Sequence, residues 1–268
     1  MDTMKRNALL AKVNNDLRLQ FGRKHTRITH ADVEAVYTRN VLGIQADAKT
    51  SKGVNAGYLT GILYLAPASL SGVNVCPKSS AGCRAACLFS AGRGRFYAIN
   101  RARVVKTLAY HFDAPRFVQA IKKSIKSLIT KANNRGLIPV VRLNGTSDIL
   151  WERNTDIIQS FSGVQFYDYS KIVKRVLFDI PKNYHLTFSL SESNEADARL
   201  ALAKGYNVAV VFRTAAYPAT YLGATVINGD ATDLRFLDAT GTGQGVVVGL
   251  KAKGKAKGDA SGFVRDAA

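Results

Sequence analysis

A rhythm of short apolar runs constrains the fold of this chain more than any other feature. Runs rich in Val, Ile and Phe alternate with helical or loop stretches, which is typical of parallel strands joined by crossover connections. The predicted strands cover residues 61–67, 138–143, 164–168, 185–190, 207–212, 224–228 and 245–250. Seven such strands favour an α/β fold, either a partial or a complete parallel β/α barrel of the TIM type. A doubly wound sheet is the alternative, but no Gly-x-Gly-x-x-Gly motif follows a predicted strand to indicate dinucleotide binding.

Helical patterns surround these strands. Leu9 to Leu19 form a broad apolar stripe and Thr29 is a capping residue, so the first 45 residues are expected to be a helical extension. Residues 46–59 show no periodicity and are expected to form a loop. Two long helices are predicted near residues 96–111 and 115–135, and helical or loop stretches, notably 149–161 and 195–204, separate the later strands. The chain then divides into a helical extension (1–45), a barrel-like domain (46–250) with a cysteine loop (76–87), and a basic tail (251–268).

All three cysteines lie in one short stretch, at Cys76, Cys83 and Cys87. A disulfide would leave one of them unpaired and is unusual in a reducing cytosol. Thiolates are soft ligands that suit zinc or iron–sulfur clusters, and three of them can hold three corners of a cluster and leave a fourth open. We therefore expect the three cysteines to bind a metal centre, and we favour an iron–sulfur cluster of the [4Fe–4S] type. A redox or packing role for the thiols is the alternative.

Zinc is the competing metal. A structural zinc site has four ligands and usually shows two Cys or His pairs in sequence, which this chain lacks. One histidine, or an aspartate, could still complete a zinc site in space. The histidines are His25, His30, His111 and His185.

Charge points to an anionic partner. The chain carries 38 Lys and Arg against 19 Asp and Glu, a formal net charge of +19. Such an excess favours nucleic acid or a phosphorylated small molecule as the partner. The Lys/Gly/Ala-rich stretch from Lys251 to Lys257 has no periodic apolar face, so we expect a mobile basic arm there. No run of eighteen apolar residues and no secretory signal is present, so we expect no membrane partner and a cytoplasmic protein.

Polar residues follow one predicted strand after another. In parallel β/α folds, ligands bind at the carboxyl ends of the strands, and the cysteine loop also follows such an end. Candidates for acid–base chemistry and anion clamping are Asp148, Asp168, Lys171, Glu192 and Arg213. Candidates for cofactor binding are Asn144, Ser147, Ser189, Ser191 and Asn228. All of them are expected to meet at one rim, around the metal.

Five motifs carry a resemblance to a known family. They lie at residues 76–87, 141–148, 165–171, 184–189 and 248–254. From about residue 45 to its end, the chain resembles the bacteriophage "gene product 88" domain family, a name that carries no activity. The resemblance implies a phage-type protein, which would act in the host cell cytoplasm if phage-encoded.

A looser resemblance comes from three cysteines that follow the first strand of a β/α barrel. This arrangement is similar to the radical S-adenosylmethionine enzymes, where three cysteines hold a [4Fe–4S] cluster and S-adenosylmethionine binds the fourth iron. The resemblance implies that Cys76, Cys83 and Cys87 are cluster ligands. The spacing of six and then three residues, Ala86 before the last cysteine and Asn144-Gly145 after the next strand all depart from the superfamily pattern. Despite these departures we still expect a cluster, but they argue against the use of S-adenosylmethionine as its ligand.

Two classes of function follow. The first is an enzyme, of a radical-S-adenosylmethionine-like kind, whose open cluster site acts on a nucleotide or nucleic acid. The second is a non-catalytic nucleic-acid-binding or redox-sensing protein in which iron–sulfur or zinc organises a loop. The sequence leaves the substrate and the oligomeric state open.

Overall fold

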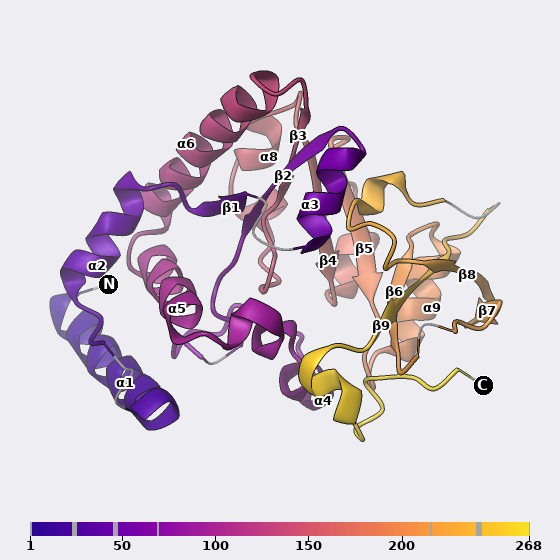
Figure 1. The fold of residues 1–268 in the computed structure, drawn as a ribbon, viewed down its shortest axis with the longest axis horizontal. Helices are drawn as coiled ribbons and strands as arrows, with labels where there is room; N and C mark the ends of the chain where they lie inside the picture. The colour runs from indigo at the N-terminus through magenta and orange to yellow at the C-terminus, as the bar shows by residue number, and fades with distance from the viewer. Residues whose placement is uncertain are drawn as a thin grey trace.

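The computed structural model describes residues 2–22, 26–44, 48–68, 70–214, 216–239 and 243–267. His25 and parts of the predicted extension, loop and tail lie outside these ranges. Figure 1 shows an α/β protein with helices around one broad sheet; the N-terminal helices lie at the left of that view and the C-terminal segment at its lower right.

The strands of the described chain form one nine-stranded sheet in the order β1-β2-β3-β4-β5-β6-β9-β8-β7. They are β1 (Leu42–Ile44), β2 (Tyr58–Leu63), β3 (Ile138–Arg142), β4 (Gln165–Ser170), β5 (Tyr184–Ser189), β6 (Val208–Phe212), β7 (Thr220–Tyr221), β8 (Ala224–Asn228) and β9 (Val247–Lys251). Every neighbouring pair from β2 to β8 is parallel, while β1 and β7 add antiparallel strands at the two edges. The α/β class is therefore confirmed.

The sheet is open. Its two edges, β1 and β7, do not pair with each other, so the expected complete barrel is wrong for the described chain. Both edge strands are short and antiparallel, which leaves few backbone groups for further pairing. The seven predicted strands all overlap the parallel part of the sheet, whereas β1 and β7 were not predicted because runs of two or three residues carry no period.

Helices fill the connections between strands. They are α1 (Thr3–Phe21), α2 (His30–Glu34), α3 (Ala48–Asn55), α4 (Ala81–Ala85), α5 (Tyr97–Phe112), α6 (Ala114–Asn133), α7 (Trp151–Asn154), α8 (Ile157–Ser160) and α9 (Glu195–Ala203). Short 3-10 turns add η2 (Ala35–Thr38), η3 (Leu88–Ser90), η4 (Gly92–Arg95), η5 (Val173–Val176), η6 (Arg235–Leu237) and η7 (Gly254–Gly258). Asp113 ends α5 and caps α6 through the amide of Arg116, so the two long helices meet at a sharp corner.

Side chains alternate between the two faces of the sheet, and each face has its own core. On one face Leu59, Phe166 and Phe188 belong to the main core, which extends through α5 and α6 to buried residues of α1. On the other face Val140 and Tyr167 pack with Leu234, next to η6. Both faces are thus covered, as parallel sheets require.

Two connecting segments contain short helices. The expected loop 46–59 contains α3, because Gly53 is buried against Leu234 and Thr60 and tertiary packing overrides weak local propensity. The stretch 149–161, expected to be helical or a loop, contains two short helices, α7 and α8, separated at Thr155, whose backbone is extended.

The tail 251–267 packs on the molecule, so the expectation of a mobile arm is wrong for these residues. Ala252, Ala256 and Val264 are buried together with Ala86 of the cysteine loop. The amide of Arg265 donates to the carbonyl of Val211 at 2.8 Å, which ties the tail to β6. No helix of the described part of the chain is long and apolar enough to cross a membrane.

Candidate functional site

The three cysteines line one pocket at the carboxyl edge of the sheet. Its volume is about 150 Å³. The cysteine loop follows β2, and the other walls come from the residues at the ends of β3, β4 and β5. The lining residues are Pro67, Cys76, Ser79, Cys83, Cys87, Arg142, Asn144, Gly145, Thr146, Ser147, Asp148, Tyr169, Ser170, Lys171 and Ser189. The structure thus brings together eight of the side chains singled out from sequence, namely Cys76, Cys83, Cys87, Asn144, Ser147, Asp148, Lys171 and Ser189.

Local hydrogen bonds shape the cysteine loop. The amide of Cys76 donates to Asn74 Oδ1 at 2.9 Å, and Ser80 caps α4 by accepting from the amide of Cys83 at 3.2 Å. Cys83 therefore lies in the first turn of α4, and Cys87 follows its end. This short helix sets the spacing of the second and third thiols.

Glu192 fixes α4 to the rest of the rim. Its carboxylate accepts from Ser80 Oγ and from the amide of Gly82, both at 2.7 Å. Burial alone would raise the pKa of Glu192, but these two hydrogen bonds lower it below its ordinary value. Glu192 does not line the pocket; it positions the loop that does.

All three cysteines are thiols without a disulfide. Burial, with a contribution from nearby Cys87, Asp148 and Cys83, raises the pKa of Cys76 to about 11. Burial likewise raises the pKa of Cys87. At neutral pH both groups are therefore neutral, and a metal would have to displace their protons.

Two cations stand beside these thiols. Lys171 Nζ donates to Ser189 Oγ at 2.9 Å, and Arg103 of α5 lies over the ring of Tyr64. Both lower the pKa of Cys87, against the larger effect of burial. Arg103 is only 9% exposed, and its Nε has no hydrogen-bond partner. Within the described ranges neither cation forms an ion pair with a carboxylate, which is costly for a buried guanidinium.

A buried polar network lies beneath the pocket and holds the strand ends together. Asp148 accepts from Ser170 Oγ at 2.8 Å, from the amide of Lys171 at 2.8 Å and from Arg175 Nη1 at 3.0 Å. Arg175 also binds both carboxylate oxygens of Glu152, at 2.9 and 3.0 Å. Asp148 is thus a structural anchor as well as a pocket residue.

Asp168 extends this network. It accepts from the amide of Asn144 at 2.7 Å and from the Tyr184 hydroxyl at 3.0 Å, and Tyr184 also contacts Arg175. Burial raises the pKa of Asp168 to about 7, although Arg142 and Arg175 oppose the rise. Asp168 is 1% exposed and lies behind Asn144 rather than in the pocket wall.

The remaining candidates lie elsewhere. Ser191 is buried and its carbonyl accepts from Arg265 at 3.0 Å. Arg213 binds Asp266 at 2.6 Å and holds the tail, while Asn228 accepts from the amide of Asp230 in a turn after β8. None of the three lines the pocket, so strand polarity alone placed them too close to it.

Four functional or supporting residues escaped the sequence reading: Arg103, Arg142, Glu152 and Arg175. Arg142 ends β3, lines the pocket and pairs with Asp233 at 3.1 Å. Its position at a strand end is a signal that could have been used. Arg103, Glu152 and Arg175 carry no such signal, because each looks like an ordinary surface residue of a helix.

No preformed site for a single metal ion is present among the described side chains. No three His, Cys, Asp or Glu side chains there converge as a set of ligands. The described histidines do not line the pocket: His30 binds Asn7, and His185 lies inside the sheet with its pKa lowered to about 4 by burial. Of the fourth ligands considered for zinc within the described ranges, only an aspartate, Asp148, lies in the pocket, and its carboxylate already accepts hydrogen bonds from Ser170, Lys171 and Arg175.

A family model described as gene product 88 matches residues 38–267. The chain belongs to the gene product 88 family. No curated protein and no solved structure matches the chain. The radical S-adenosylmethionine resemblance is therefore unsupported. The gene product 88 match contains the whole cysteine pocket, the buried network and the packed tail.

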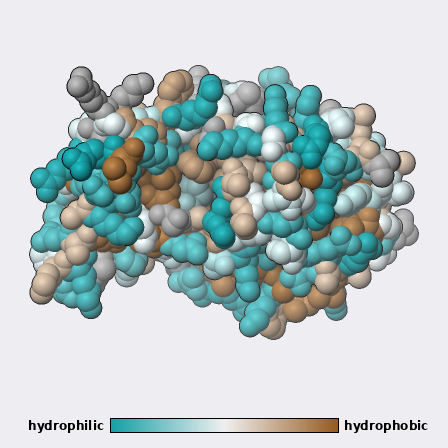
Figure 2. All heavy atoms as spheres, turned by 90° about the horizontal axis from the view of Figure 1, so that it is seen from below, coloured by the Kyte–Doolittle hydropathy of each residue, from teal (hydrophilic) through white to brown (hydrophobic). Residues whose placement is uncertain are grey.

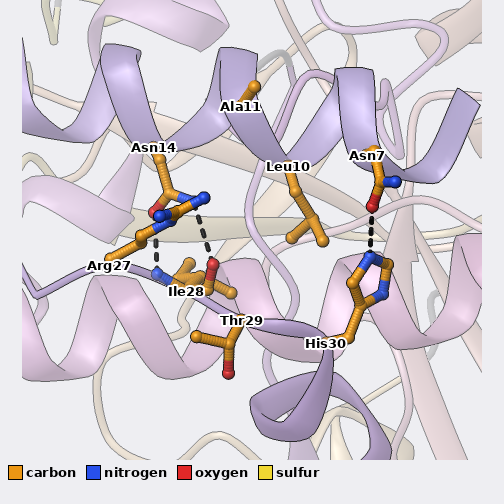
Figure 3. A pocket seen from close by; sticks show the side chains of 8 residues that line it. All are labelled: Asn7, Leu10, Ala11, Asn14, Arg27, Ile28, Thr29 and His30. Atoms are coloured by element: carbon orange, nitrogen blue, oxygen red, sulfur yellow. Dashed lines mark hydrogen bonds between the residues drawn. The ribbon is translucent and has the colours of Figure 1, made fainter. Parts of the chain in front are cut away.

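A second, larger pocket of about 520 Å³ lies outside the gene product 88 match, between α1 and residues 27–30 (Figure 3). Asn14 exchanges two hydrogen bonds with the backbone of Ile28, and Asn7 Oδ1 lies 2.6 Å from His30 Nε2. These two amides are thus occupied in fastening α1 to the chain. The pocket is lined by Asn7, Leu10, Ala11, Asn14, Arg27, Ile28, Thr29 and His30.

Proposed function

We propose that Cys76, Cys83 and Cys87 bind one iron–sulfur cluster in the pocket at the carboxyl edge of the sheet. The observation that carries the proposal is the pairing of three thiols with two cations, Lys171 and Arg103, that no described carboxylate neutralises. Cysteine ligands bind clusters as thiolates, so a bound cluster would bring negative charge next to both cations. That charge would stabilise the buried Arg103, which otherwise has an unpartnered Nε.

The arrangement favours a cluster over a single ion. The ligands of a tetrahedral zinc ion must converge on one point, whereas the cysteines of a cluster bind different iron atoms and stand farther apart. Three thiols that share a pocket without converging suit the second case. The absence of a fourth cysteine in the sequence leaves one iron open to a ligand.

When bound, such a cluster would supply a redox or Lewis-acid centre at the edge of what we take to be a partial barrel. The residues around the opening suit an anionic ligand. Lys171 and Ser189 form one polar pair, and Arg142 faces the same pocket. A nucleic acid or a phosphorylated small molecule has the required charge, in line with the net charge of +19. S-adenosylmethionine stays a weaker candidate, and no reaction is assigned.

Anaerobic purification tests the proposal. The full chain should be brown and contain about four iron and four sulfide per protein if the cluster is [4Fe–4S]. Cys76→Ala, Cys83→Ala and Cys87→Ala should each lose most of the iron, whereas Ser79→Ala, a pocket residue without a thiol, should keep it. Colourless protein with one zinc per chain, or protein that takes up no metal on reconstitution with iron and sulfide, would refute the cluster.

A further inference from the structure

We infer that a basic rim beside the cysteine pocket, formed by the cysteine loop, η4 and η7, binds single-stranded nucleic acid. The basic rim is defined by five exposed cations, Lys78, Arg84, Arg95, Lys255 and Lys257. The inference deepens the proposed function by naming the partner of the same edge, and it rests on that proposal only for the role of the pocket.

The chain around the pocket is depleted of acidic residues. Asp113 is the only Asp or Glu between Asp47 and Asp148, a stretch that contains the cysteine loop, α5 and α6. Within it, residues 76–95 contain four Lys or Arg and no Asp or Glu, so the segment beside the pocket contributes only positive charge to the surface potential. This local lack of acidic residues indicates where an anionic partner would bind, which the net charge of the whole protein does not.

Two carboxylates near the rim, Glu192 and Asp259, are engaged in local hydrogen bonds. Glu192 binds Ser80 and Gly82, and Asp259 binds Ser261 and the amide of Val264. Among the described residues, none of the five rim cations forms an ion pair with a carboxylate. The rim thus keeps its positive charge available for an external anion.

Close packing of the small residues in the tail holds the tail lysines at the surface. Ala252 and Ala256 are buried, and a Cβ on Gly254, which has a φ of +57°, would lie 2.8 Å from the Cβ of Ala91. The small residues of the repeat therefore pack against the segment after the cysteines, and Lys255 and Lys257 face outward. In Figure 1 the yellow turn of η7 lies beside α4, and both lie at the bottom of that view.

Exposed apolar side chains accompany the cations. Leu88 is 61% exposed and Phe96, directly after Arg95, is 62% exposed. Figure 2 views the molecule from below, the side of η7, and shows a mostly hydrophilic face with small hydrophobic groups. An exposed aromatic ring next to cations can stack a base, a mode open to single strands because the bases of a duplex are already stacked. No amphipathic helix forms the rim, so an anionic membrane fits it less well.

Fluorescence anisotropy with a labelled 30-nucleotide oligo(dT) tests the inference. Lys255→Glu/Lys257→Glu should weaken binding by at least about tenfold and flatten the salt dependence, because each lost phosphate contact reduces the slope by about one. Lys126→Glu/Lys131→Glu is the matched control: it makes the same charge change on exposed positions of α6 and should leave affinity within about threefold. Phe96→Ala should weaken binding to oligo(dT) more than binding to a duplex of equal length.

The outcomes separate this inference from the cluster. Circular dichroism and iron content should be unchanged in Lys255→Glu/Lys257→Glu, so a loss of binding there is not a loss of fold or of metal. Equal losses in rim and control variants, or binding to anionic phosphatidylserine vesicles without binding to oligo(dT), would overturn the rim. If the protein binds oligo(dT) but never takes up iron, only the cluster proposal is refuted. If iron-loaded protein does not bind oligo(dT), only the nucleic-acid role of the basic rim is refuted.

Discussion

The carboxylate of Glu192 accepts a 2.7 Å hydrogen bond from the amide of Gly82, a residue 110 positions earlier in the chain. This bond, with the one from Ser80, joins the loop after β5 to the first turn of α4. The position of Cys83 therefore depends on a residue that never touches the pocket.

Glu192→Ala should loosen the cysteine loop. Loss of two hydrogen bonds to a carboxylate should lower the free energy of unfolding by about 1.5–3 kcal/mol, and Glu192→Gln should lose less. Urea unfolding measures the energy, and the alkylation rate of Cys83 by iodoacetamide measures the loosening. Glu195→Ala, at an exposed pair with Arg199, is the control and should change neither. An unchanged alkylation rate in Glu192→Ala would contradict the positioning role.

Gly82→Ala should overpack the same contact. A Cβ there would lie 2.1 Å from Ser261 Oγ and 2.9 Å from the Cβ of Phe263, so the tail must shift away from α4. Overpacking of this kind costs about 1–3 kcal/mol. Gly258→Ala has open space around its Cβ and should be neutral by thermal denaturation. Equal melting temperatures for both variants would show that the tail does not press on α4.

Arg175→Met should be among the most destabilising single changes. It leaves Asp148 and Glu152 buried without their cation, and breaking a buried ion pair costs about 3–5 kcal/mol. Arg199→Met removes an exposed pair and should cost less than about 1 kcal/mol. Urea midpoints compare the two variants, and similar midpoints would mean that the network beneath the pocket contributes little.

Asp168 should make stability fall as the pH rises. Its pKa is about 7 in the folded protein against 3.8 as the ordinary value, so between those pH values the native state holds a proton that the unfolded chain releases. The contribution is about 1.4 kcal/mol per pH unit. His185 acts in the opposite sense between about pH 4 and 6.5, because its pKa is lowered by burial.

The difference between wild type and Asp168→Asn isolates the aspartate. The variant cannot ionise at this position. As the pH increases from 4.5 to 7, its free energy of unfolding should therefore rise relative to that of the wild type. Urea titrations across this range measure the difference. Parallel curves for the two proteins would show that Asp168 is charged throughout.

The sequence predicted the parallel strands well because Val-, Ile- and Phe-rich runs between helices have a clear pattern. Strand polarity then placed Asn144, Asp148, Lys171 and Ser189 beside the cysteines without any structural information. Polarity could not say how deep each side chain lies. The side chain of Asp168, in β4, lies on the face of the sheet that α5 and α6 cover. Its carboxylate accepts buried hydrogen bonds there, which only the three-dimensional packing reveals.

Other features were beyond the sequence for different reasons. Arg175 pairs with Glu152 and Asp148, which lie 23 and 27 positions before it in the chain. The periodicity of the sequence does not indicate contacts over such separations. A partial or complete barrel was expected because seven strands were counted, but the count could not decide whether the sheet closes and did not reveal the short strands β1 and β7 at its edges. The tail was predicted to be mobile because Gly and Ala lack an apolar face, although small residues are what close packing against Ala91 requires.

The alternation of lysines with small residues in the tail makes this segment tolerant of exchange but not of a change in length. Arginine could replace Lys255 or Lys257 with little effect, since both side chains extend into solvent. One residue inserted before Lys251 would instead move Lys251 and Lys255 into the buried positions 252 and 256 and turn the alanines outward. Insertions and deletions of a single residue should therefore be purged from this segment during evolution, while its composition drifts.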